Sequence, residues 1–217
     1  MTEKSEFSTL LAGVGGQGLM LLSSVIGEAC AMSGQRIITG EQHGLSQRSG
    51  SISVHLRIGP DVISPLIPIG SANAIISLEA LETLRYIEYL QDDGIILMNS
   101  RIMHPITETS QVAKDKELSY FGLEEIEKRL SEVTENVLAL DALALARQAG
   151  NPLTENIVLL GAVCAFEAFP IPMDKVRSAI SQIVPEKARE ANLTAFELGL
   201  KASHARFCDK FPCKNLE

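Results

Sequence analysis

Basic residues are scarce in this sequence, tryptophan is absent, and no long uninterrupted apolar run occurs. Its 19 Lys and Arg residues are outnumbered by 27 Asp and Glu residues, which gives a formal net charge of -8. Surfaces that bind nucleic acid or an anionic membrane need clustered positive charge, so we expect neither partner. A helix that spans a bilayer needs roughly 20 apolar residues in succession, and no such run is present. An anionic ligand must therefore be bound locally.

Cysteine is also scarce, with two isolated residues (Cys30 and Cys164) and a pair near the C-terminus (Cys208 and Cys213). The polar first residues lack the charged and then apolar pattern of a secretory signal, so we expect a cytoplasmic protein. In that reducing compartment the default state is the free thiol. The cysteine pair with His204 is an alternative metal site, but three candidates do not make a recognisable ligand set.

Hydrophobic periodicity predicts a strand, a helix and a second strand in the first 40 residues. Residues 7–12 form a short apolar run, and the apolar spacing from Leu19 predicts a helix that ends at Gly34. Residues 36–39 follow as another strand, and a polar loop is expected from Gly40 to Ser49. This order of elements is a βαβ beginning.

The next segment alternates apolar and polar residues from Ser51 to Ile58, which predicts a half-buried strand, antiparallel or at a sheet edge. Three prolines between Gly59 and Gly70 predict an extended connection. The remaining pattern predicts strands at 74–77, 94–98 and 137–140 and helices at 80–90, 123–130, 142–149, 155–168, 173–183 and 186–208. We therefore expect an α/β fold with a mixed, mostly parallel sheet, a Rossmann-like βαβ start and a helical C-terminal part. The whole chain, 1–217, is expected to be one domain, with an α/β core at 1–140 and a helical extension at 141–217.

A glycine-rich loop, Gly13-Val14-Gly15-Gly16-Gln17-Gly18, lies where the first strand meets the first helix. Glycines let the backbone turn sharply and approach a ligand, and the N-terminus of the helix attracts phosphate. The alternative is that these glycines only close the turn between strand and helix. An NAD site would also need an acid at the end of the second strand, but the first acid there is Glu41, already in the expected loop. Gln17 offers an amide to a ligand or to a neighbouring subunit.

A second segment, from Glu41 to Gly50, contains directed hydrogen-bonding groups instead of the Lys, Glu and Asp of an ordinary solvated loop. Arg48 suits bidentate binding of carboxylate or phosphate. His43 alone is more often a structural histidine, and Arg48 alone more often an ion-pair partner. Together, beside the glycine loop, they are candidate ligand contacts.

The two segments in tandem, followed by Val54-x-x-Arg57-Ile58-Gly59, resemble the gamma-type subunits of the 2-oxoacid:ferredoxin oxidoreductases. Within that family the Glu41-x-His43-Gly44-Leu45-Ser46-Gln47-Arg48 form is most similar to the small (beta) subunits of indolepyruvate:ferredoxin oxidoreductase. The resemblance continues through Asn151, Leu159-Leu160-Gly161-Ala162 and Asn192-x-x-Ala195-Phe196-x-x-Gly199. It covers most of the chain.

The resemblance implies a multi-subunit enzyme that oxidatively decarboxylates a 2-oxoacid, of the indolepyruvate or 2-oxoglutarate type, to an acyl-coenzyme A and passes electrons to ferredoxin. The sequence has neither a Gly-Asp-Gly run for thiamine-bound magnesium nor a Cys-x-x-Cys-x-x-Cys run for an iron–sulfur cluster. Thiamine diphosphate, magnesium and the clusters are therefore expected on larger catalytic partner subunits, and the isolated chain is expected to be inactive.

This chain is expected to assist assembly and to contact coenzyme A. The resemblance and the loop chemistry give as contact candidates Gly15, Gly16, Gln17, Gly18, His43, Gln47 and Arg48, with no catalytic residue among them. Two alternatives stay open: a stand-alone NAD-dependent dehydrogenase, and a purely scaffolding subunit.

Overall fold

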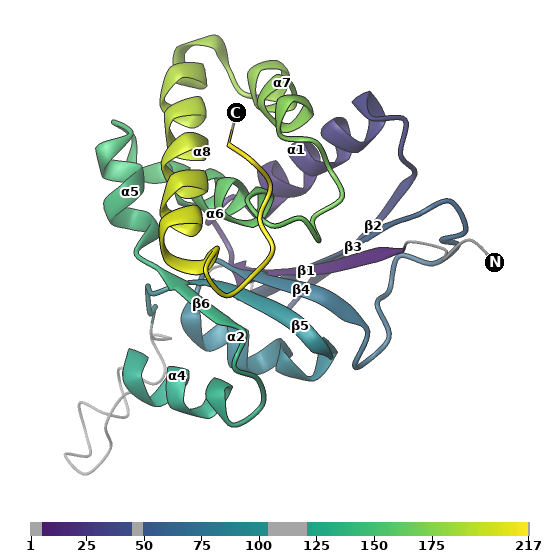
Figure 1. The fold of residues 1–217 in the computed structure, drawn as a ribbon, viewed down its shortest axis with the longest axis vertical. Coiled ribbons are helices and arrows are strands. Elements are labelled where there is room, and N and C mark those ends of the chain that lie inside the picture. Colours follow the sequence, from purple (N-terminus) through teal and green to yellow (C-terminus); the bar gives the residue numbers. More distant parts are fainter. Residues whose placement is uncertain (1–5, 45–49, 104–120, 217) are drawn as a thin grey trace.

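The computed structural model describes residues 6–44, 50–103 and 121–216, which form a six-stranded sheet with helices on both faces (Figure 1). The strands are β1 (Phe7–Val14), β2 (Ile37–His43), β3 (Ser51–Ile58), β4 (Ala72–Ser77), β5 (Leu90–Asn99) and β6 (Val137–Leu140). The helices are α1 (Leu19–Met32), α2 (Ala80–Tyr86), α4 (Leu123–Ser131), α5 (Ala142–Gln148), α6 (Glu155–Cys164), α7 (Met173–Ile183) and α8 (Glu186–Phe207), with short 3-10 turns η1 (Ile87–Tyr89) and η2 (Pro152–Thr154). None of the described helices is long and apolar enough to cross a membrane.

The strand order is β2-β3-β1-β4-β5-β6, and only β3 runs against the others. The predicted mixed, mostly parallel sheet is confirmed. In the predicted βαβ start, β1 and β2 are indeed parallel, but β3 lies between them and pairs with both. This insertion moves β2 two strand spacings from β1, roughly 10 Å.

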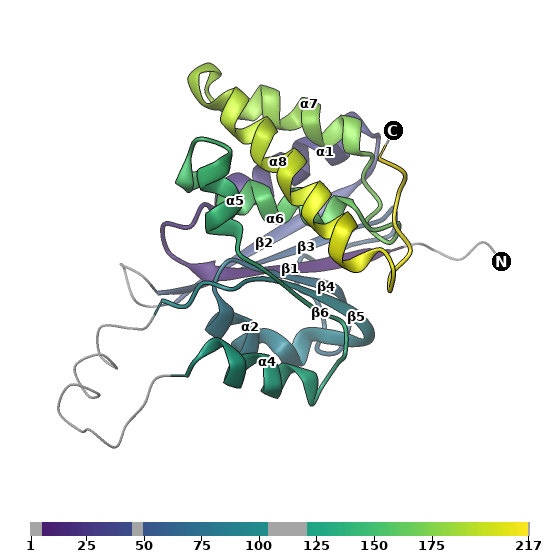
Figure 2. The same cartoon turned by 60° about the vertical axis from the view of Figure 1, so that its left-hand side comes forward.

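The two faces of the sheet are covered unequally (Figure 2). Helices α1, α5, α6, α7 and α8 lie on one face, and α2 and α4 lie on the other. The larger core joins the strands to α1 and to the C-terminal helices, so these helices share one hydrophobic interior with the sheet. The smaller core lies under α2 and α4.

Helices α6 and α8 cross at two glycines. A Cβ atom on Gly161 would come 2.0 Å from the carbonyl oxygen of Phe196, and one on Gly199 would come 1.9 Å from that of Val158. Only a residue without a side chain fits at either position, because the obstacle is backbone in both cases. The two glycines therefore set how closely the C-terminal helices approach each other.

The strand β3 is antiparallel, as predicted, but it is not half-buried. Ser53 and His55, on its polar face, are as buried as its apolar residues. The extended connection after β3 covers that face: the backbone N–H of Ile67 donates to Nδ1 of His55 at 3.1 Å. Burial lowers the pKa of His55, in keeping with a neutral ring whose Nδ1 accepts a hydrogen bond. The polar residues that alternate along β3 therefore form a face that a loop covers, and that face is not exposed to solvent.

Several local predictions were also wrong. The helix predicted at 80–90 ends at Tyr86, and the strand predicted at 94–98 begins at Leu90. The helix predicted at 155–168 ends at Cys164. Strand β2 continues through Gly40 and Glu41 to His43, so the first residues of the expected polar loop are paired with β3. Cys208 and Cys213 form a disulfide with Cα atoms 5.6 Å apart, where free thiols were expected. The turn that follows α8 brings the two residues together. The chain then pairs with Phe166 at Cys213, which fixes the C-terminal segment against the end of α6.

Candidate functional site

The carboxyl ends of β1 and β4 meet at a point where the chain changes faces of the sheet. These strands are parallel neighbours, but α1 follows β1 on one face and α2 follows β4 on the other (Figure 2). In open α/β sheets such a switch point leaves a crevice beyond the carboxyl ends of the strands, and ligands bind there. The glycine loop lies at this point.

The backbone of the glycine loop adopts conformations that glycine permits and other residues rarely adopt. Gly16 and Gly18 have φ values of +96° and +80°, which side chains rarely adopt. Gly18 is the N-cap of α1, and its carbonyl accepts from the Nδ2 atom of Asn156 at 3.0 Å. A Cβ atom on Gly18 would lie 2.6 Å from that nitrogen, whereas one on Gly16 would meet nothing within 4 Å. The loop is thus packed at Gly18 and open at Gly16.

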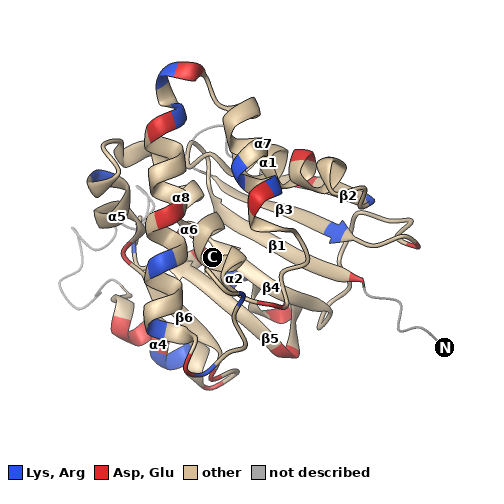
Figure 3. Cartoon of the chain, turned by 45° about the horizontal axis from the view of Figure 1, so that its top comes forward, with Lys and Arg blue, Asp and Glu red and all other residues tan. Residues whose placement is uncertain are grey.

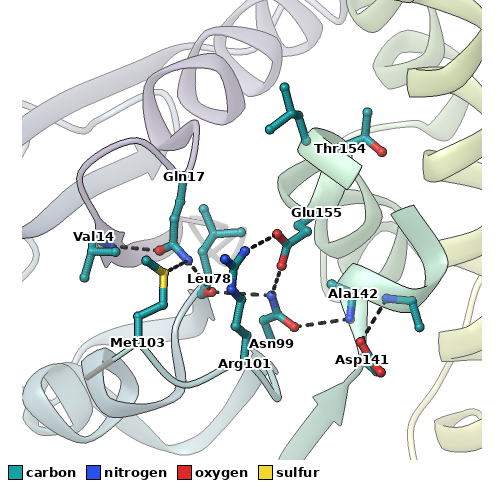
Figure 4. Close-up of polar contacts among 12 residues, drawn as sticks. Val14, Gln17, Leu78, Asn99, Arg101, Met103, Asp141, Ala142, Thr154 and Glu155 are labelled. Atoms are coloured by element: carbon teal, nitrogen blue, oxygen red, sulfur yellow. Dashed lines mark hydrogen bonds and ion pairs between the residues drawn. The ribbon is translucent and has the colours of Figure 1, made fainter. Parts of the chain in front are cut away.

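The side chain of Gln17 points back into the protein (Figure 4). Its Oε1 atom accepts from the backbone N–H of Val14 at 2.9 Å, and its Nε2 atom donates to the carbonyl of Leu78 at 2.9 Å. Nε2 also lies 3.6 Å from the sulfur of Met103. The amide therefore joins the loop after β1 to the turn after β4.

The chemistry of the loop suits an anion at its open side. Helix α1 has no acidic residue in its first turn and no side-chain cap, so neither its first turn nor its N-cap side chain compensates its N-terminal partial charge. The N–H of Gly15 is used internally, since it donates to the carbonyl of Gly50 at 3.0 Å. A phosphate group would therefore approach at Gly16 and the first turn of α1.

The second predicted segment begins on β2, with β3 between it and β1, and ends beside the glycine loop. Gly50, its last residue, contacts Gly15, and His43 is level with Gly13 across β3 because both are in register with Ile52. The ring of His43 is exposed, and its Nε2 lies 3.4 Å from Glu41. Gln47 and Arg48 lie outside the described residues.

A polar cluster at the same edge was not predicted from the sequence (Figure 4). Asn99, at the end of β5, donates from Nδ2 to Glu155 at 2.6 Å and accepts from the N–H of Ala142 at 3.2 Å. Glu155, in the first turn of α6, also accepts from Nη1 of Arg101 at 2.5 Å. The available signal was the position of Asn99 at the end of a predicted parallel strand, since such ends share one edge of the sheet.

A buried carboxyl group ties the next segment to this edge. Glu79 is almost fully buried and accepts from the backbone N–H groups of Met103 at 2.8 Å and Glu82 at 2.9 Å. Burial raises the pKa of Glu79, and its backbone hydrogen bonds oppose that shift only in part. Its contacts assign it a structural role, because both oxygens are engaged with the protein.

The described residues contain no group of three or more His, Cys, Asp or Glu side chains placed to hold a metal ion. Charged residues of both signs occur along α8 and α4 (Figure 3). The described part of the site contains three features that could contact a ligand: the glycine loop, the N-terminus of α1 and the guanidinium group of Arg101.

Comparison with known proteins identifies the family. The family model described as pyruvate ferredoxin/flavodoxin oxidoreductase matches residues 8–202. The chain therefore belongs to this family and is a subunit of a 2-oxoacid:ferredoxin oxidoreductase, as the two motifs predicted. Among its relatives, the indolepyruvate oxidoreductase subunit IorB of Pyrococcus horikoshii is 40% identical over 200 residues, which are 91% of this chain and 96% of the relative. The subunit of the same name from Archaeoglobus fulgidus is 37% identical over 88% of this chain and 92% of its own length.

Solved structures share the fold. The gamma subunit of a keto/oxoacid ferredoxin oxidoreductase from Geobacter sulfurreducens superposes with a TM-score of 0.66 at 22% identity, covering 92% of this chain and 99% of that one. The 2-oxoglutarate:ferredoxin oxidoreductase of Magnetococcus marinus, solved with 2-oxoglutarate, coenzyme A and succinyl-CoA bound, gives 0.69 at 18% identity. That match covers 98% of this chain and 34% of the longer one.

Proposed function

We propose that this chain is the small subunit of an indolepyruvate:ferredoxin oxidoreductase. The observation that carries the proposal is the 40% identity to an indolepyruvate oxidoreductase subunit over nearly that relative's whole length. Relatives named for other substrates are more distant: the common gamma subunit of the pyruvate and ketoisovalerate oxidoreductases of Pyrococcus abyssi is 25% identical. The His43-Gly44-Leu45-Ser46-Gln47-Arg48 form of the second motif favours the same aryl-pyruvate branch.

The catalytic centres belong, in this proposal, to larger partner subunits. Thiamine diphosphate with magnesium, and the iron–sulfur clusters that pass electrons to ferredoxin, need ligand runs that this sequence lacks. This chain supports the assembly and presents the edge of its sheet to coenzyme A, whose thiol accepts the acyl group when it is bound. The coenzyme A reported in the Magnetococcus marinus enzyme supports that choice of ligand.

The contacts proposed for coenzyme A are Gly15, Gly16, Gln17 and Gly18 in the first motif and His43, Gln47 and Arg48 in the second. Backbone at Gly16 and the first turn of α1 would orient phosphate. The side-chain amide of Gln17 already forms hydrogen bonds with the backbone of Val14 and Leu78. Gln17 would therefore contribute by holding the loop through these two bonds. The acidic chain needs no basic patch to bind phosphate in this way.

The geometry disfavours an NAD-dependent dehydrogenase. In that class an acid at the end of the second strand, beside the first, binds the ribose hydroxyls. Here Glu41 lies on β2, which β3 separates from β1, and it interacts with His43. The remaining alternative, a scaffolding subunit with no ligand of its own, differs from the proposal only in ligand contact.

The test is purification of the native complex together with an omission experiment. We expect a larger subunit with iron–sulfur absorbance to copurify with this chain, and we expect reduction of ferredoxin by indolepyruvate to require both. The isolated chain, given thiamine diphosphate, coenzyme A and an artificial acceptor, should show no turnover. Turnover by this chain alone would refute the proposal.

A further inference from the structure

Arg101 presents a partly open guanidinium group at the switch point. It follows β5, and its side chain is 39% exposed. Within residues 6–44, 50–103 and 121–216, its side chain has one acceptor, Glu155, reached through Nη1. A guanidinium group carries five N–H donors in a rigid fork, so most of its donors remain for another acceptor.

The guanidinium group is positioned by a partly buried carboxylate and, behind it, a buried amide. Glu155 is 13% exposed and Asn99 is fully buried, and the amide of Asn99 donates to Glu155. The same amide lies 3.5 Å from the carbonyl of Leu78, which also accepts from Gln17. A continuous set of hydrogen bonds therefore connects Arg101 to the glycine loop, and Figure 4 shows these side chains grouped together.

Glu155 does not depend on Arg101 for its own stabilisation. It lies in the first turn of α6, where the helix N-terminus favours a negative charge, and it accepts from Asn99 as well. An isolated ion pair at this exposure contributes little to stability. Orientation of the guanidinium group is a better account of the arrangement, in which Glu155 contacts Arg101 and the buried Asn99 contacts Glu155.

We propose that Arg101 is a ligand-binding residue that takes an oxyanion, either a phosphate of coenzyme A or the carboxylate of the 2-oxoacid, at the open side of the glycine loop. Glu155 is its positioning residue. Both oxyanions match the planar fork of arginine, and a Lys side chain would match either less well. This inference rests on the proposed function and adds to it a residue outside the two sequence motifs.

The experiment uses the complex with its catalytic partner. Arg101→Gln should raise the KM for coenzyme A, or the KM for indolepyruvate, by about 10- to 100-fold, the loss expected for a hydrogen bond to a charged group. Arg101→Lys should recover only part of that loss. Arg129→Gln is the matched control, because Arg129 is half-exposed and paired with Glu125 on α4, away from the switch point. Thermal melting of each complex separates folding from binding.

The probes distinguish the two oxyanions. If Arg101 binds phosphate, the defect should appear with coenzyme A and shrink when pantetheine, which has no phosphate, is the acyl acceptor. If it binds carboxylate, the KM for indolepyruvate should rise and that for coenzyme A should not. Unchanged KM values for both substrates in a folded, active Arg101→Gln complex would overturn the inference and leave the proposed function intact. A wild-type complex without indolepyruvate turnover would instead refute the proposed function.

Discussion

The backbone N–H of Gly15 donates to the carbonyl of Gly50 at 3.0 Å, and this contact joins the two sequence motifs at one edge of the sheet. The first motif begins in the last residues of β1, and the second begins in the last residues of β2 and ends at Gly50, just before β3. Strand β3 brings them together, because it pairs with β1 from Val14 and Ser51 onward. The tandem pattern that marks the family is therefore one local structure.

Gly18→Ala should destabilise the chain by about 1–3 kcal/mol, since Gly18 has a φ of +80° and a Cβ atom would crowd Asn156. Gly27→Ala is the control: Gly27 is inside α1, a Cβ atom there meets nothing within 4 Å, and alanine should add about 0.5–1 kcal/mol. Chemical denaturation measures both. Equal stability of the two variants would show that the loop does not need glycine at position 18.

Gly161→Ala should cost about 3 kcal/mol or more, the upper end of the range for overpacking, because its Cβ atom would overlap a carbonyl of α8. Gly199→Ala should behave in the same way from the other helix. We expect the two losses to be less than additive, since one separation of α6 from α8 relieves both contacts. Full additivity in the double variant would contradict a shared crossing point.

Glu79 should make stability depend on pH in the direction opposite to that of an ion-paired carboxyl group. Burial raises its pKa, so the folded chain takes up the proton before the unfolded chain does, and its ionised form lowers stability at neutral pH. As the pH falls from 7 towards 4.5, the wild type should gain stability relative to Glu79→Gln. Glu125, whose pKa its hydrogen bond to Arg129 lowers, is the control: the wild type should show no such gain relative to Glu125→Gln over the same range, and it should lose stability only when the pH falls below the ordinary pKa of a carboxyl group. Parallel curves for both pairs would contradict the assignment for Glu79.

Thiol counting checks the disulfide. The unfolded, unreduced protein should show two reactive thiols, Cys30 and Cys164, and reduction should raise the count to four. In the folded protein both thiols should react slowly, because each is buried and burial raises its pKa to about 12. Four thiols before reduction would mean that Cys208 and Cys213 are not joined.

Local pattern was enough to predict most elements of this fold. The apolar spacing from Leu19 and the cap at Gly34 define α1, and the helix predicted at 173–183 is α7. The insertion of β3 between β1 and β2 could not be predicted in this way, because pairing over long separations leaves no periodic signal. The burial of His55 depends on a connection that begins after its own strand has ended.

The candidate site likewise has one part that could be predicted from the sequence and one part that could not. The glycine loop was predictable because its residue types and its position between strand and helix carry the signal. The cluster of Asn99, Arg101 and Glu155 was not, since it joins residues 56 positions apart through side chains that look ordinary in isolation. The prediction of free thiols at Cys208 and Cys213 was wrong. It rested on the expected cellular compartment, which carries no information about the turn that brings the two residues together.

The most direct test of the central claim is the substrate preference of the reconstituted complex. Ferredoxin reduction should be measured with indolepyruvate, pyruvate and 2-oxoglutarate at matched concentrations, with and without coenzyme A and with and without this chain. We predict that indolepyruvate gives the highest kcat/KM, and that the rate requires both coenzyme A and this subunit. A complex that prefers 2-oxoglutarate or pyruvate, or that keeps its full rate without this chain, would contradict the account.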